Sequence, residues 1–175
     1  DFTAVDVSET MGTPMGTAGV CESLSSGDCS VANLTAAFGQ KATEASSICN
    51  GESNGTSVES GTDYCTGNGT GYQPKTGQSG ITPSHDSVSI GLFQVNISAH
   101  DIGLGCTKAF NTAYTSTIAK DKTKCWVVNR SLYDSCVTAA KNATTNISAA
   151  KSIYSGAGNS WAQWGANKHS GCNFH

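Results

Sequence analysis

The amino-acid sequence predicts an α+β fold that is mainly helical, with a small sheet-and-loop region and several disulfides. Two segments, 30–51 and 131–154, place apolar residues at helical spacing. Between them, residues 50–85 contain several glycines and almost no large apolar side chain, which indicates loops or a small irregular sheet. The chain of 175 residues is the size of one domain, and its eight cysteines are typical of a disulfide-stapled one.

The first segments of the chain predict an arm followed by a helix. Residues 1–29 mix Gly, Pro, Ser and Thr with little periodicity, so we expect an irregular N-terminal arm held by Cys21 and Cys29, and a single catalytic domain over 30–175. The first helix has Ser30 or Asn33 as its possible cap and ends near Gly51. A glycine inside this helix, at position 39, weakens it by about 1 kcal/mol relative to alanine.

The second half of the chain predicts one further apolar element, a second helical region and a tethered tail. The run Val88–Val95 reads either as a buried strand or as a helical stretch, and periodicity alone does not decide between them. In the region 131–154, a helical face is formed by Ile147, Ala150, Ile153 and Tyr154. We expect this region to end at Gly156 and Gly158, and Cys172 to tie the tail to the domain.

Charge and cysteine spacing exclude several classes of protein. Ten Lys and Arg against thirteen Asp and Glu give a net charge of −3, which disfavours binding to nucleic acid or to an anionic membrane. No apolar run of about 18 residues predicts a membrane helix, and the first residues lack the pattern of a signal peptide, so we expect a secreted, already processed chain. The cysteines lack zinc-module spacing, and their pairing stays open.

Secretion also makes N-glycosylation possible at seven Asn-x-Ser/Thr triplets, although a chain rich in these residues forms such triplets by chance. The triplets begin at Asn33, Asn54, Asn68, Asn96, Asn129, Asn142 and Asn146.

A short series of motifs carries the chemistry. Glu52 lies at the end of the first predicted helix, in Ile48-Cys49-Asn50-Gly51-Glu52-Ser53-Asn54, and is followed by Gly-Leu-Phe-Gln-Val at 91–95. Further on stand Leu-Tyr-Asp at 132–134, Asn-Ile at 146–147, Ile-Tyr at 153–154 and Trp-Ala-Gln-Trp-Gly at 161–165. This order resembles the lysozyme superfamily, in particular goose-type lysozymes and lytic transglycosylases, over residues 34–165, about three quarters of the chain.

The resemblance implies a lysozyme-like fold, with helices and a small β-region flanking a glycan cleft, and a general acid at Glu52. To protonate a leaving glycosidic oxygen, a carboxylic acid must still hold its proton near neutral pH, which requires an apolar wall that raises its pKa. The alternative for Glu52 is a solvated carboxylate at a helix end.

The second carboxylate is less clearly marked. Egg-white-type relatives have an Asp where this chain has Ser89, and a goose-type Asp position holds Asn96. Asp86, five residues before Gly91, is the nearest match to another goose-type Asp, so we expect it to be the base that activates water. The rivals for this role are Asp63 and Glu59, and Asp86 is alternatively a turn residue. Without a second carboxylate, the resemblance favours lytic transglycosylation.

Three residues are expected to contact or orient the substrate. Ser89 and Gln94 present hydrogen-bonding groups to the sugar or are satisfied strand residues, and Tyr154 orients the acid or fills the core. Trp161 and Trp164 suit either sugar stacking or a core closed beside a disulfide.

The expected enzyme is a monomeric antimicrobial muramidase that cleaves the β-1,4 links of peptidoglycan. The acidic charge balance leaves chitin, chitosan or mannan as alternative substrates, and a catalytically silent glycan-binding protein as the alternative class. We expect no cofactor and no metal, because His85, His100, His169 and His175 lack ligand spacing and are expected at the surface. A Ser-His-Asp hydrolase is disfavoured by the absence of Gly-x-Ser-x-Gly.

Overall fold

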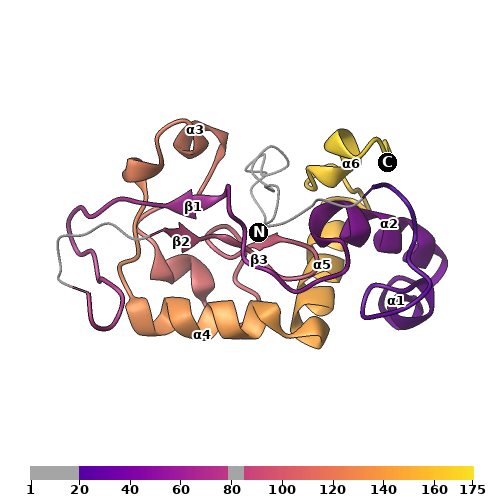
Figure 1. Cartoon of the computed structure of the whole chain (residues 1–175), viewed down its shortest axis with the longest axis horizontal. Coiled ribbons are helices and arrows are strands. Elements are labelled where there is room, and N and C mark those ends of the chain that lie inside the picture. The colour runs from indigo at the N-terminus through magenta and orange to yellow at the C-terminus, as the bar shows by residue number, and fades with distance from the viewer. Residues whose placement is uncertain (1–19, 79–84) are drawn as a thin grey trace.

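The computed structural model describes residues 20–78 and 85–175 and has the predicted α+β class, with about 43% of those residues in helices, small antiparallel sheets and four disulfides. Strands β1 (Tyr64–Cys65) and β2 (Asp86–Ser87) lie at the left in Figure 1 and helix α2 (Ala42–Ser53) at the right. Helix α4 (Arg130–Lys141) runs along the lower edge between these two regions.

The first predicted helix is two helices. Helix α1 (Val31–Phe38) begins at Ser30, whose hydroxyl accepts a hydrogen bond from the Asn33 amide at 3.1 Å, as a capping serine does. Gly39 takes a φ of +54° and starts a 3₁₀ turn (Gly39–Lys41), so the expected weakening at this position becomes a break. Helix α2 then continues to Ser53, beyond the expected end, until Asn54 adopts the left-handed conformation.

The apolar run Val88–Val95 is neither one strand nor one helix. Strand β3 (Ser89–Ile90) turns through Gly91 and returns as β4 (Val95–Asn96), while β1 and β2 form a separate antiparallel pair. Gly91 has a φ of +84°, and a Cβ there would collide with the Ala140 carbonyl and the Asn146 side chain. Only glycine therefore lets this hairpin lie against the helices.

The region 131–154 is likewise two helices, α4 and α5 (Ala143–Gly156), because Asn142 leaves the helical conformation and caps α5 by accepting a hydrogen bond from the Thr145 amide at 3.1 Å. The predicted end at Gly156 is confirmed. The remaining elements are the short helices α3 (Ser116–Ala119) and α6 (Ala166–His169) and the 3₁₀ turns Cys106–Ala109 and Lys122–Lys124.

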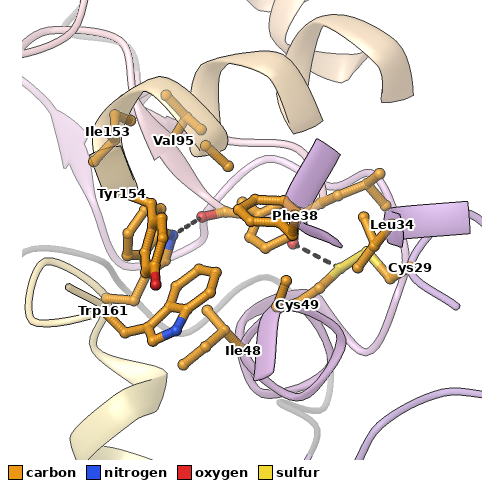
Figure 2. Close-up of a cluster of buried hydrophobic side chains, with 14 of the residues drawn as sticks. Cys29, Leu34, Phe38, Ile48, Cys49, Val95, Ile153, Tyr154 and Trp161 are labelled. Carbon is orange, nitrogen blue, oxygen red and sulfur yellow. Dashed lines mark hydrogen bonds between the residues drawn. A yellow bond between two sulfur atoms is a disulfide. The ribbon is translucent and has the colours of Figure 1, made fainter. Parts of the chain in front are cut away.

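Two clusters of buried apolar side chains hold these elements together. The first joins α1, α2, the β3–β4 hairpin, α5 and the tail, and Figure 2 shows Phe38, Tyr154 and Trp161 at its centre. The Trp161 ring lies 4.4 Å from that of Tyr154 and 5.5 Å from that of Phe38. Trp161 and Trp164 are both fully buried, so of their two expected roles the structure supports the core one.

The second cluster lies between the strands and α4 and includes Val88, Ile97, Tyr114 and Tyr133. In the first cluster, a hydrogen bond joins the tail to the β3–β4 hairpin: Trp164 Nε1 donates to the Phe93 carbonyl at 3.0 Å.

All eight cysteines form disulfides, as expected from their number. The pairs are Cys21–Cys172, Cys29–Cys49, Cys65–Cys125 and Cys106–Cys136. The cysteines at 21 and 29 do hold the described part of the predicted arm, and the one at 172 ties down the tail. Residues 1–19 of that arm lie outside the described residues.

The Cys21–Cys172 disulfide is expected to contribute strongly to stability because it closes a loop with a sequence separation of 151 residues. Replacing both cysteines by serine should lower the free energy of unfolding by about 2–5 kcal/mol, measured by denaturant titration. A loss below about 1 kcal/mol would show that the tail is held by its packing alone.

Four disulfides are compatible with an extracellular protein. Across residues 20–78 and 85–175, the helices are too short or too polar to span a membrane.

Candidate active site

The candidate active site centres on Glu52, in the last turn of α2. Its carboxyl is only 2% exposed, and Oε1 accepts a hydrogen bond from the backbone N–H of Ala166 at 3.0 Å, where α6 begins. The preceding residue, Gly51, permits this approach: a Cβ there would lie 2.7 Å from the Ala166 Cβ and 2.9 Å from Ser170 Oγ. A small residue at position 51 therefore brings the start of α6 onto the carboxyl.

Burial raises the pKa of Glu52 to about 8. Desolvation is the main cause, the Ala166 N–H opposes it by stabilising the charged form, and the negative charge of Asp63 adds to the rise. None of the described Lys, Arg or His side chains forms an ion pair with Glu52. The group is therefore a carboxylic acid that keeps its proton at neutral pH, which is the property that a general acid requires.

The β3–β4 hairpin is fixed against the end of α2. Ser53 Oγ donates to the Leu92 carbonyl at 2.7 Å. From α5, Asn146 accepts from the Phe93 N–H at 2.8 Å and donates to the Ile90 carbonyl at 2.8 Å. These side chains hold the hairpin in register with the acid, so the motif Gly-Leu-Phe-Gln and Glu52 occupy one rigid unit.

Gln94, a predicted sugar contact, lies inside this hairpin. It is fully buried, and its Nε2 donates to the Val58 and Gly91 carbonyls, both at 3.0 Å. Its Oε1 is buried without a hydrogen-bond partner among the described residues. The Gln94 amide NH₂ thus stabilises the turn at Gly91. A contact between the Gln94 side-chain oxygen and a sugar stays a prediction.

Ser89, the other predicted sugar contact, is joined to Asp63. Ser89 Oγ donates to Asp63 Oδ2 at 2.9 Å, and both residues are buried. Backbone bonds fix Asp63 on both sides: its N–H donates to Ser60 Oγ at 2.9 Å, and its carbonyl accepts from the Val88 N–H at 2.9 Å. The structure thus places the Asp63 carboxyl directly beside Ser89.

Asp86, the predicted base, is engaged elsewhere. It lies in strand β2 rather than in a turn and is 1% exposed. It forms a bidentate ion pair with Arg130, in which Nη1 donates to Oδ1 at 2.8 Å and Nη2 donates to Oδ2 at 3.0 Å. Arg130 also donates twice to the Gln73 carbonyl. The geometry gives Asp86 the function of a counter-ion that docks α4 on the strands. Sequence reasoning missed Arg130, which carries no local signal of its partner 44 residues away.

Glu59 and Tyr154, the remaining predicted residues, contact partners other than Glu52. Glu59 is half exposed and pairs with Lys141 at 3.0 Å. Tyr154 packs on Trp161 and Phe38, and the ammonium of Lys151 lies 5.5 Å from its ring. These contacts give Tyr154 a place in the core, and its expected role in orienting the acid stays a prediction.

One of the four histidines departs from expectation. His100 is buried, and burial lowers its pKa to about 4, whereas His85, His169 and His175 are exposed as predicted. His100 lies in the loop after β4 and lines one hollow with the α5 residues Thr145 and Ser148, a long-range placement that the local sequence does not show. Within the described ranges, no three His, Cys, Asp or Glu side chains gather as a possible metal site.

A hollow of about 460 Å³ lies beside the loop that carries Asp63, a volume within the range of small-ligand sites. Its lining includes Glu59, Ser60, Tyr64, His85 and Ser87. The rings of Tyr64 and His85 stack in parallel at 4.2 Å, giving one wall of the hollow a flat surface.

Asp86→Asn is expected to lower the free energy of unfolding by about 3–5 kcal/mol, because it leaves the buried guanidinium of Arg130 without its counter-charge. Denaturant unfolding measures this loss, and the double variant Asp86→Leu/Arg130→Met should recover most of it. If Asp86→Asn is instead as stable as the wild type but inactive, Asp86 is the base that the sequence predicts.

A scan with protein-family models, a search of curated proteins and a search of solved structures each gave no significant match.

Proposed function

We propose that this protein is a secreted glycoside hydrolase with a lysozyme-like fold, which cleaves β-1,4-linked glycan strands with Glu52 as its general acid. The observation that carries the proposal is a buried carboxyl, at the end of a helix and against the Gly-Leu-Phe-Gln hairpin, whose pKa is raised to about 8. Because such a carboxyl is poorly solvated, it keeps its proton at neutral pH. A protonated carboxyl can donate that proton to the leaving oxygen of a glycosidic bond.

In the proposed reaction, Glu52 gives its proton to the glycosidic oxygen while the bond from that oxygen to the anomeric carbon breaks. The sugar gains oxocarbenium character, and attack at the anomeric carbon completes the cleavage. The N–H of Ala166, which bonds Glu52 Oε1, then stabilises the carboxylate that proton transfer leaves behind. One hydrogen bond therefore both positions the acid and supports its conjugate base.

Peptidoglycan is the first substrate to test, because the motifs around Glu52 and Gly91–Val95 resemble enzymes that act on it. With its net charge of −3 the chain gains no attraction to anionic cell walls, so chitin, chitosan and mannan belong in the same panel. An extracellular, monomeric enzyme that acts on bacterial walls would be antimicrobial.

The test is digestion of purified peptidoglycan and of the other glycans by the wild type and by Glu52→Gln. We expect the wild type to release soluble fragments from at least one glycan and the variant to release them at least about 10²-fold more slowly. Equal release by both proteins would remove Glu52 from the reaction. Binding without cleavage by either protein would favour a glycan-binding protein, and anhydro ends on the products would identify a transglycosylase.

A further inference from the structure

We propose that Asp63, held by Ser89, is the second catalytic carboxylate of this site, in place of Asp86. The inference rests on the proposed function of Glu52 and names the group that acts with it. In the sequence, the position two residues before Gly91 holds Ser89, where the resemblance to egg-white-type lysozymes implies an acid. In the structure, Ser89 Oγ donates to Asp63 Oδ2 at 2.9 Å, so a carboxylate reaches that position from another segment of the chain.

The placement of Asp63 is rigid. Its backbone is bonded on one side to Ser60 Oγ and on the other to the Val88 N–H, both at 2.9 Å, and its side chain is bonded to Ser89 in strand β3. Because β3 continues into the hairpin that Ser53 and Asn146 fix against α2, Asp63 and Glu52 belong to one hydrogen-bonded framework. A catalytic pair requires such fixed relative positions.

The electrostatics of the two carboxyls agree with this placement. Desolvation is the main cause of the raised pKa of Glu52, and the charge of Asp63 adds to the rise. At neutral pH Glu52 keeps its proton. Asp63 Oδ2 accepts the hydrogen bond of the Ser89 hydroxyl, so this carboxyl is placed as an acceptor beside the proton donor, the arrangement of acid and base that glycoside hydrolysis needs.

The other two candidate acids each form an ion pair. Asp86 is enclosed by Arg130, and Glu59 is paired with Lys141 on a half-exposed surface. Neither charge is among the causes of the raised pKa of Glu52. Of the three acids that sequence reasoning offered, Asp63 is therefore the one coupled to the proton donor.

In the proposed hydrolysis, Glu52 is the proton donor and Asp63 is the proton acceptor. Glu52 transfers its proton to the leaving glycosidic oxygen as the bond to the anomeric carbon breaks. The oxygen of a water molecule forms the new bond to that carbon, and one proton of this water passes to the Asp63 carboxylate. The products are two glycan pieces, one with a new reducing end, and the proton on Asp63 returns to Glu52 through solvent.

Asp63→Asn, measured on the glycan that the wild type cleaves, tests the assignment. We expect kcat to fall by about 10²-fold or more, the usual contribution of a general base, with reducing ends on the wild-type products. Ser89→Ala should cause a smaller loss, because the carboxylate remains but is less well held. Asp28→Asn, which removes one exposed charge from the segment before α1, is the matched control and should leave kcat unchanged.

A second measurement is independent of activity. Removing the charge of Asp63 should move the pH at which Glu52 titrates to a lower value, observed by NMR of a Glu52 carboxyl label. Full activity of a folded Asp63→Asn variant, or anhydro ends on the wild-type products, would overturn this proposal while leaving Glu52 as the acid. If Asp63→Asn does not fold, unchanged kcat and an unchanged Glu52 titration in Ser89→Ala would overturn it. A wild type without activity on any glycan would instead contradict the proposed function itself.

Discussion

Glu52→Gln is expected to lower the rate of glycan cleavage by about 10²–10⁴-fold, the range that a positioned general acid contributes. Glutamine has nearly the shape of glutamic acid, and its oxygen still accepts the hydrogen bond from the Ala166 N–H. The change therefore removes the transferable proton and little else. Release of soluble glycan, followed as a rate at pH 6–7, measures the effect.

Glu44→Gln is the matched control for this variant. Glu44 lies in the first turn of α2, at the opposite end of the helix from Glu52, and forms an ion pair with the exposed Lys41. We expect its rate to equal that of the wild type. A loss in Glu52→Gln no greater than the loss in Glu44→Gln would show that position 52 supplies no proton.

Glu52→Gln is also expected to stabilise the protein relative to the wild type as the pH rises, by up to about 5 kcal/mol at pH 8. Below pH 4.5, the carboxyl is protonated in the folded and unfolded chains alike. Between 4.5 and about 8, the folded chain keeps the proton that the unfolded chain has lost, so the free energy of unfolding falls by about 1.4 kcal/mol per pH unit. Glutamine does not titrate, so the variant escapes this loss.

Denaturant unfolding of both proteins at pH 4, 6 and 8 measures this difference. Glu44→Gln again serves as the control, because the exposed end of the helix should give no comparable divergence. Parallel pH profiles for the wild type and Glu52→Gln would mean that the buried carboxyl titrates as a solvated one does. In that case it would be ionised at neutral pH and unable to act as the acid.

Local signals in the sequence predicted where helices begin and end better than they predicted the breaks within them. Ser30, one of the two predicted caps, is the N-cap of α1, Gly156 ends α5 and Glu52 lies at the end of a helix, because caps and helix ends depend on neighbours in sequence. The breaks at Gly39 and Asn142 divided two predicted helices into four, since a periodic apolar face continues across a short interruption.

The candidate site was predicted less completely, for a physical reason. The Ala166 N–H on Glu52, the Asp63 carboxylate on Ser89 and the Arg130 guanidinium on Asp86 join segments separated by 114, 26 and 44 residues. Such pairs arise from the packing of helices and strands, and no spacing within one segment encodes them. The same limit explains the burial of His100, which depends on the position of α5.

The disulfide between Cys21 and Cys172 makes almost the whole described chain a covalent ring. A single backbone cut within this ring, for instance at the exposed residues 54 and 56–57, leaves both halves attached through sulfur. Nicked molecules would run as one species on a non-reducing gel and separate only after thiol treatment. A protein exposed to proteases would therefore lose no fragment after a first cleavage within this ring, because the disulfide keeps the two pieces covalently joined.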